Sequence, residues 1–316
     1  MLRMENLSFV IQGPFFNNNE FTTESCASTI RRLFPKSNII FSTWAEPECK
    51  KFWDLLILNK DPGPGGKYYL DQRDALDNVN RQIVSSANGL AQAQTEYSIK
   101  IRSDVYFKSS ALLHLLEDGK TEPSEYTFSS NYLITASNLS CNPLTKNTML
   151  FHPCDWFVAG KTSDLIHYFD IPLAPKEYFN YHRIDHLPPI FQHPIASRYA
   201  SEQYILTSVI KKSNIKVRIC ADAYDLNNES LLDSLRIFKY NFKLLPSWKL
   251  GFNSYKYRIM RHTSISNHFS EGEYKHVTKD PLTSLHHMYY NRHTLHRICD
   301  TALNALVRYP KAKFSK

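Results

Sequence analysis

The feature that most constrains the fold is a succession of short apolar segments with a helical segment between the first two. Residues 7–12 and 38–44 are rich in apolar side chains and short enough to be strands. Between them, residues 23–34 repeat apolar side chains at helical spacing, and Pro35 ends the pattern. Residues 54–58 form a further apolar segment. Near-continuous apolar strands are typical of a sheet covered on both faces, so the sequence predicts an α/β fold with a mostly parallel sheet.

A second informative stretch is residues 97–107. Tyr97, Ile99 and Ile101 alternate with polar residues, which predicts a strand that ends near Asp104. In open α/β sheets, ligands bind outside the carboxyl ends of the strands. A carboxylate flanked by Lys100 and Arg102 suits a site that handles phosphate, either directly or through a divalent metal. The alternative is that Asp104 is an ordinary turn or N-cap residue.

Two polar segments precede this strand. Residues 76–93 have helical periodicity, and the first turns carry Asn78, Asn80, Arg81 and Gln82, an unusual density of planar hydrogen-bonding side chains. These side chains indicate either ligand recognition or a solvated helix face. The glycine-rich residues 61–66 follow a predicted strand and predict either a phosphate-contacting loop or a plain turn. Because the helix leads into the 97–107 strand, we expect Arg81 and Asp104 on the same rim of the sheet.

The middle of the chain adds further predicted elements and two candidate carboxylates. Asp155 lies beside Trp156, just before an apolar strand that ends at Gly160, and is a candidate catalytic group or a turn acid. Glu202 lies in the first turn of a predicted helix, where the helix dipole alone is a sufficient reason for an acid. His152 precedes a proline, which predicts an exposed turn. The other predictions are helices over 109–117, 162–169 and 201–210, and strands over 126–129 and 216–220.

The charge is unevenly distributed along the chain, whose net charge is +8. Residues 1–235 contain 23 Lys and Arg against 26 Asp and Glu, whereas residues 236–316 contain 15 against 4. We therefore predict two regions, a main domain over 1–235 and a basic helical region over 236–316. An apolar stripe between residues 295 and 306 predicts an amphipathic helix that either lies on an anionic membrane or packs against the core.

Several sequence signatures are absent, and their absence guides what we expect of partners, cellular location and cysteine chemistry. No nucleic-acid fold signature accompanies the basic charge, so nucleic acid is not an expected partner. No run of 18 apolar residues and no signal-peptide pattern occurs, and the six cysteines form no Cys-x-x-Cys pair. We expect a cytoplasmic protein with reduced cysteines, peripheral on the inner face of the cytoplasmic membrane.

Seven short motifs occur in order along residues 7–215: Gln12-Gly13-Pro14, Ser42-Thr43-Trp44, Asp61-Pro62-Gly63, Asn78-x-Asn80-Arg81-Gln82, Lys100-x-Arg102-Ser103-Asp104, His152-Pro153-x-Asp155-Trp156-Phe157 and Ser201-Glu202-Gln203-Tyr204. Together they resemble the WavE lipopolysaccharide synthesis family. The resemblance implies a bacterial glycosyltransferase of the GT-A type, with a Rossmann-like sheet. Such an enzyme moves a sugar from a nucleotide-sugar donor to a lipid-linked or glycan acceptor, here a growing lipopolysaccharide, O-antigen or capsular glycan.

The resemblance also implies roles for individual residues. GT-A enzymes usually hold the donor diphosphate through Mn²⁺ or Mg²⁺ at an Asp-x-Asp motif, and the matching position here reads Arg102-Ser103-Asp104. Asp104 is the expected metal ligand, and direct pairing of Arg102 with phosphate is the alternative. The catalytic base is expected to be Glu202 or Asp155, with Glu202 preferred for its place at a late helix start. The residues expected to bind the donor are Gln12, Gly13, Asp61, Asn80, Arg81, Gln82, Lys100 and Arg102.

Two other functions compete with sugar transfer. A nucleotidyltransferase of sugar activation also uses a Rossmann-like sheet and phosphate-binding cations, but the chain lacks a glycine-rich triphosphate signature. A non-catalytic protein that binds anions or membranes through residues 236–316 is the alternative from another class.

Overall fold

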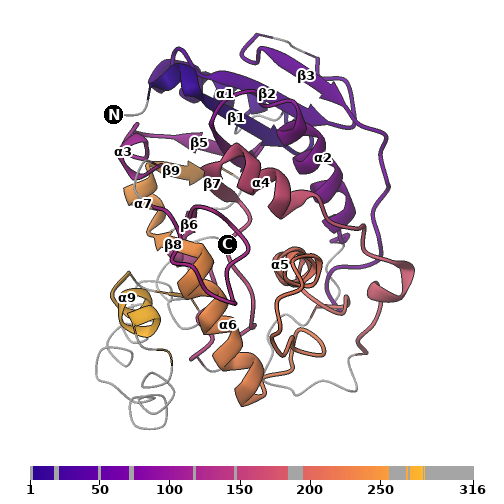
Figure 1. Cartoon of the computed structure of the whole chain (residues 1–316). Helices are drawn as coiled ribbons and strands as arrows, with labels where there is room; N and C mark the ends of the chain where they lie inside the picture. Colours follow the sequence, from indigo (N-terminus) through magenta and orange to yellow (C-terminus); the bar gives the residue numbers. More distant parts are fainter. Residues whose placement is uncertain are drawn as a thin grey trace, which may run out of the picture.

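The computed structural model describes residues 3–17, 21–48, 51–70, 75–116, 119–145, 148–183, 195–255, 268–269, 271–279 and 281. Its centre is a seven-stranded sheet with the order β3-β2-β1-β4-β7-β6-β8 (Figure 1). The strands of this sheet are β1 (Leu7–Gln12), β2 (Asn38–Thr43), β3 (Leu55–Leu58), β4 (Tyr97–Arg102), β6 (Leu133–Ala136), β7 (Phe157–Lys161) and β8 (Phe242–Leu245). A separate two-stranded ribbon pairs β5 (Val105–Phe107) with β9 (Phe252–Ser254).

The direction of the strands confirms the predicted mostly parallel sheet. β1, β2, β3 and β4 run in parallel, and β6 is parallel to β8. β7 is antiparallel to both of its neighbours, β4 and β6, so within this sheet it alone runs in the reverse direction. The amino end of β7 therefore lies at the same edge as the carboxyl ends of the other strands.

Helices cover the sheet on both faces, as the apolar strands predict. The longer helices are α1 (Thr23–Leu33), α2 (Val79–Ala91), α4 (Thr162–Phe169), α5 (Ser201–Lys212), α6 (Asn228–Asn241) and α9 (Glu271–Lys279). Shorter turns of helix are η1 (Met4–Asn6), α3 (Leu113–Leu116), η2 (Ser137–Leu139), η3 (Lys176–Tyr178) and α7 (Ser247–Leu250). α2 and α4 pack against each other over one face, whereas α1 contacts β5 on the opposite side of β1.

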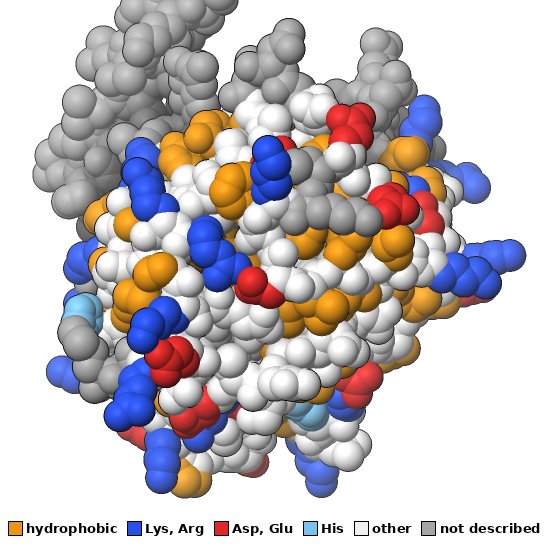
Figure 2. All heavy atoms as spheres, turned by 90° about the horizontal axis from the view of Figure 1, so that it is seen from above, with side chains coloured by type: hydrophobic (Ala, Val, Ile, Leu, Met, Phe, Trp, Pro, Cys, Tyr) orange, Lys and Arg blue, Asp and Glu red, His pale blue; other side chains and the backbone are white. Residues whose placement is uncertain are grey.

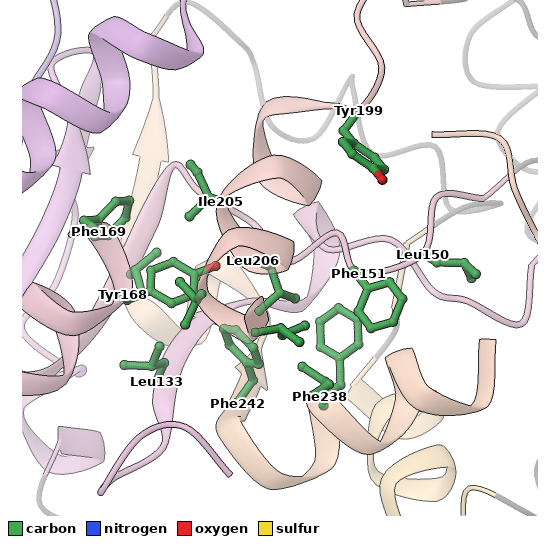
Figure 3. Packing of buried hydrophobic residues seen from close by; sticks show 14 of the residues in the cluster. Leu133, Leu150, Phe151, Tyr168, Phe169, Tyr199, Ile205, Leu206, Phe238 and Phe242 are labelled. Atoms are coloured by element: carbon green, nitrogen blue, oxygen red, sulfur yellow. The ribbon is translucent and has the colours of Figure 1, made fainter. Parts of the chain in front are cut away.

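Alternate side chains of each strand enter different cores. On β1, Val10 belongs to the core that includes α2, α4, α5 and α6, while Phe9 and Ile11 belong to the core that includes α1. Figure 3 shows the first core, where Phe242 of β8 lies between Leu133 of β6 and Phe238 of α6. Burial on both faces is the reason that strands such as β1 and β6 carry mainly apolar side chains.

The predicted domain boundary falls inside a continuous element. Residue 235 lies within α6, and β8 follows α6 directly and forms an edge of the central sheet. No domain boundary therefore lies at this position in the structure. Tyr274 and Val277 of α9 also belong to the core beside α6. The predicted amphipathic helix over 295–306 lies outside the described residues.

The surface charge, the helices and the cysteines relate to the predicted location of the protein and to the predicted state of its thiols. On the face seen from above, Lys and Arg side chains lie among Asp, Glu and apolar side chains (Figure 2). Within the described ranges, no helix combines the length and the apolar character needed to cross a membrane. Four described cysteines, Cys26, Cys141, Cys154 and Cys220, are buried free thiols.

Candidate functional site

The candidate site lies at the edge of the sheet where β1, β4 and β7 meet. Gln12, the last residue of β1, is paired with Arg102, the last residue of β4, and the N–H of Ser103 donates to the carbonyl oxygen of Gln12 at 2.9 Å. The N–H of Arg102 donates to the carbonyl oxygen of Trp156 at 3.2 Å, just before β7. The strand order also reverses here, with β2 and β3 on one side of β1 and the later strands on the other. Such a switch point is where open α/β sheets bind their ligands.

A pair of carboxyl groups stands at this edge, and it consists of the two predicted catalytic residues. Asp155 comes from the segment before β7, and Glu202 from the first turn of α5. Burial and the neighbouring Asp155 charge, together with a hydrogen bond between the two side chains, raise the pKa of Glu202 well above its usual range. Two close carboxylates cannot both ionise without a large cost, so the pair favours a state in which the two side chains share one proton.

The Asp155 carboxylate is oriented by α2. The Gln82 side-chain amide donates a short hydrogen bond to Asp155 Oδ2. The other oxygen, Oδ1, is buried and has no hydrogen-bond donor among the described residues. The sequence predicted Gln82 and Asp155 as site residues separately, and the structure brings them into contact.

A strained residue begins the segment that carries Asp155. Phe151 has a φ of 54°, in the left-handed region that bulky side chains rarely adopt, although it is fully buried. Its N–H donates to Ser234 Oγ of α6 at 2.8 Å, which anchors the segment to the core. The core around the Phe151 ring, shown in Figure 3, holds this conformation in place.

Lys100 is fully buried beside the carboxyl pair. Its Nζ donates to the carbonyl oxygen of Asp155 at 2.5 Å and lies 5.1 Å from the centre of the Phe169 ring. Burial lowers the pKa of Lys100 to about 8, although the Asp155 charge acts in the opposite direction. The predicted donor-binding Lys100 thus contacts the backbone of the segment that carries Asp155.

His152 joins the same cluster, so the prediction that it occupies an exposed turn is wrong. Its side chain is 12% exposed, and Nε2 lies 3.5 Å from Glu202 Oε2. Burial lowers the pKa of His152, but Cys141 and the Asp155 carboxylate outweigh that effect and raise it. The expectation that a residue before proline occupies an exposed turn does not hold for His152. The sequence feature that indicates its location is that His152 precedes Asp155 by three residues.

Arg102 and Asp104 form a close ion pair at the end of β4. Arg102 Nε and Nη2 donate to the two oxygens of Asp104 at 3.0 and 2.9 Å, and the guanidinium lies 4.6 Å from the Trp156 ring. Ser254 Oγ of β9 adds a bond to Asp104 Oδ2 at 3.1 Å. A divalent metal binds through free carboxylate oxygens, and both oxygens of the fully buried Asp104 are already bound. The described residues also contain no cluster of three or more His, Cys, Asp and Glu able to hold a metal. This arrangement does not fit the expected metal.

Gln12 and Gly13 line the base of the same edge. Gln12 is buried, and its Oε1 accepts a hydrogen bond from Ser85 Oγ of α2 at 3.1 Å. Gly13 has a φ of 126°, and a Cβ at this position would lie 2.8 Å from Ser103 Oγ. The close approach of Gly13 to Ser103 explains why glycine occupies the turn after β1.

Three other predicted donor-binding residues have different surroundings. Asp61 accepts from Arg81 Nε and Nη2 at 2.8 and 2.6 Å, and Arg81 lies over the Trp44 ring at 5.1 Å, so these residues form a second cluster at the first turn of α2. Asn80 instead exchanges two hydrogen bonds with the backbone of Ala174, at 2.7 and 3.1 Å. In the structure Asn80 fastens the segment after α4 to α2.

The glycine-rich loop is shaped by packing. A Cβ at Gly65 would overlap the Phe179 ring, and one at Gly66 would lie 2.6 Å from Asn180 Oδ1. The loop therefore needs glycines to lie against residues 179–180, which favours the plain-turn interpretation of residues 61–66.

Comparison with known proteins adds one match. The family model described as WavE lipopolysaccharide synthesis matches residues 7–309 of the chain. No match was found among curated proteins.

Proposed function

Because the chain belongs to the WavE lipopolysaccharide synthesis family, we propose that it is a GT-A type glycosyltransferase. It moves a sugar from a nucleotide-sugar donor to a lipid-linked or glycan acceptor, in the assembly of lipopolysaccharide, O-antigen or capsular glycan. The observation that carries this proposal is the carboxyl pair of Asp155 and Glu202, placed with Lys100 and Arg102 at the switch point of the sheet.

Sugar transfer makes two chemical demands, and this edge can meet both. The bond between the sugar and the donor phosphate breaks, so negative charge develops on the departing nucleoside diphosphate. Lys100 and Arg102 place positive charge at the edge, and Arg81 adds a cation at the start of α2. The acceptor hydroxyl must also lose its proton as its oxygen bonds to the sugar, and a carboxylate can take that proton.

Asp155 is the better candidate for that base, which reverses the preference drawn from the sequence. A base must be ionised before the reaction, and the raised pKa of Glu202 disfavours the ionised form of that residue. Asp155 then receives the proton of the acceptor hydroxyl, while Glu202 and Gln82 hold its carboxylate in place.

Matched amide substitutions test these assignments. We expect Asp155→Asn to lower kcat by about 10²- to 10⁴-fold, because the amide cannot accept the proton. Glu202→Gln resembles the protonated acid, so we expect kcat to fall by less than about 10-fold. The exposed Glu229→Gln, on α6, serves as the control and should leave kcat unchanged. The reverse pattern, with an active Asp155→Asn and an inactive Glu202→Gln, would show that Glu202 is the base.

Binding of the donor tests the wider proposal. A nucleotide sugar that binds the folded chain raises its Tm, so we expect one member of a nucleotide-sugar panel to shift thermal unfolding. With that donor and a glycan acceptor, the released product should be a nucleoside diphosphate. Release of pyrophosphate from a nucleoside triphosphate would identify a nucleotidyltransferase instead. A panel without any shift in Tm would contradict the proposed function.

A further inference from the structure

The ion pair at the end of β4 is asymmetric in its exposure. The Asp104 side chain is fully buried, whereas the Arg102 side chain is 21% exposed. A solute that approaches this edge therefore meets the Arg102 side chain and not the Asp104 carboxylate. Asp104, which the resemblance implies as the metal ligand, is the less accessible member of the pair.

The guanidinium is held in a defined plane. The Asp104 carboxylate accepts hydrogen bonds from Nε and Nη2, along one side of the guanidinium. An arginine side chain carries five N–H donors in all. The Trp156 ring lies 4.6 Å from the guanidinium carbon. Asp104 is itself fixed by Ser254 Oγ, and its carbonyl oxygen accepts from the N–H of Tyr255 at 3.1 Å. A planar fork with a fixed orientation matches the geometry of phosphate oxygens.

We propose that Arg102 binds the donor diphosphate directly and that Asp104 is a positioning residue that orients it, in place of a metal ligand. The inference rests on the proposed function, since it concerns the diphosphate of the same donor. Asp104 offsets part of the charge of Arg102 but removes the entropy cost of ordering a flexible side chain on binding. Lys100, whose buried ammonium lies close enough to Arg102 for their charges to interact, adds positive charge behind the fork.

The test measures the Kd of UDP, GDP, ADP and dTDP by calorimetry, once in EDTA and once with Mn²⁺. We expect one of these diphosphates to bind in EDTA, with little change on adding Mn²⁺. Arg102→Lys loses the planar fork and should weaken binding by about 10-fold or more in both conditions. The control is Arg31→Lys, from an ion pair of similar length with Asp54 near the opposite edge of the sheet, and it should not change the Kd.

Asp104→Asn separates a positioning residue from a metal ligand. A positioning role predicts binding weakened by about 3- to 10-fold, by the same factor in EDTA and in Mn²⁺. If a diphosphate binds in Mn²⁺ alone and Asp104→Asn abolishes the Mn²⁺ response, the inference is overturned while the proposed function stands. If none of the diphosphates binds in either condition, both are overturned. Thermal unfolding of each variant without nucleotide identifies variants that fail to fold. If Asp104→Asn fails to fold, Arg102→Lys decides between the two roles, because the Arg102 side chain is more exposed than that of Asp104.

Discussion

At the scale of single residues, the motifs shared with the family suggested the members of the candidate site but not their contacts. Lys100, Arg102 and Asp155 lie in or beside apolar strands, where charged side chains are uncommon, whereas Glu202 was expected from its place at a helix start. Their pairing depends on elements far apart in the chain, as in the contact between Gln82 and Asp155, which are 73 positions apart. His152 was missed because a local rule about proline was applied to a position that tertiary packing buries.

The buried Lys100 gives a prediction about pH. Its pKa is about 8 in the folded chain and near 10.5 in the unfolded chain, so between these values the unfolded state binds more protons. The free energy of unfolding should therefore rise with pH over this interval, while below pH 8 the full cost of the buried charge is present. Lys100→Met removes this dependence.

Urea denaturation of both proteins from neutral to alkaline pH provides the measurement. The free energy of unfolding of the wild type, minus that of Lys100→Met, should increase by about 2 to 3 kcal/mol across the interval. The difference cancels the titration of tyrosines and other lysines common to both proteins. A difference that stays constant with pH would mean that Lys100 keeps an ordinary pKa when buried.

At the scale of elements, periodic apolar patterns predicted the structure well. The predicted bounds of β1 and α4 are those observed, and those of α2 differ by two or three residues at each end. The predicted strand over 126–129 is irregular, because the N–H of Phe128 bonds to the side chain of Asn241, which is 113 residues away. The predicted strand over 216–220 is likewise irregular, since the N–H of Arg218 bonds to the Asp233 side chain. Sequence periodicity carries no information about such distant partners.

Among the elements that were not predicted, three short strands share a cause with one shortened helix. β6 and β8 have four residues each, β8 follows α6 without a turn, and β9 has three residues. Segments this short contain too few residues for a period to be recognised. The predicted helix over 109–117 shrinks to α3, a single turn.

The contact between α2 and the sheet gives a prediction about two glycines. A Cβ at Gly89 of α2 would lie 2.4 Å from Val10 Cγ1, whereas a Cβ at Gly272 of α9 would meet nothing within 4 Å. Gly89→Ala should lower the free energy of unfolding by about 1 to 3 kcal/mol, because overpacking outweighs the gain in helix propensity. Gly272→Ala should raise it by up to about 1 kcal/mol. Chemical denaturation measures both, and a stabilising Gly89→Ala would show that α2 can shift without cost.

At the scale of the whole molecule, the basic residues that follow the sheet lead to a prediction about membranes. We propose that the chain binds the inner face of the cytoplasmic membrane through residues after 281, which contain six Lys and Arg and one Asp. Vesicle flotation should show binding to anionic lipid that weakens as salt is raised. A chain truncated after residue 281 should float less.

A larger truncation is not suitable for this assay. A chain that ends at residue 235 loses the last six of the 14 residues of α6 and the edge strand β8, so we expect it to misfold. Equal flotation of the full chain and the chain ending at residue 281 would remove the proposed role of the last residues.

The bond between Ser254 and Asp104 also has a consequence for biosynthesis. The two residues are 150 positions apart, so a ribosome needs roughly 8 to 30 s to reach Ser254 after it has added Asp104. During that time a nascent chain can pair Arg102 with Asp104 but lacks the complete β9. The edge that we propose to bind the donor is therefore completed late in translation, when Ser254 becomes able to hold Asp104 in place.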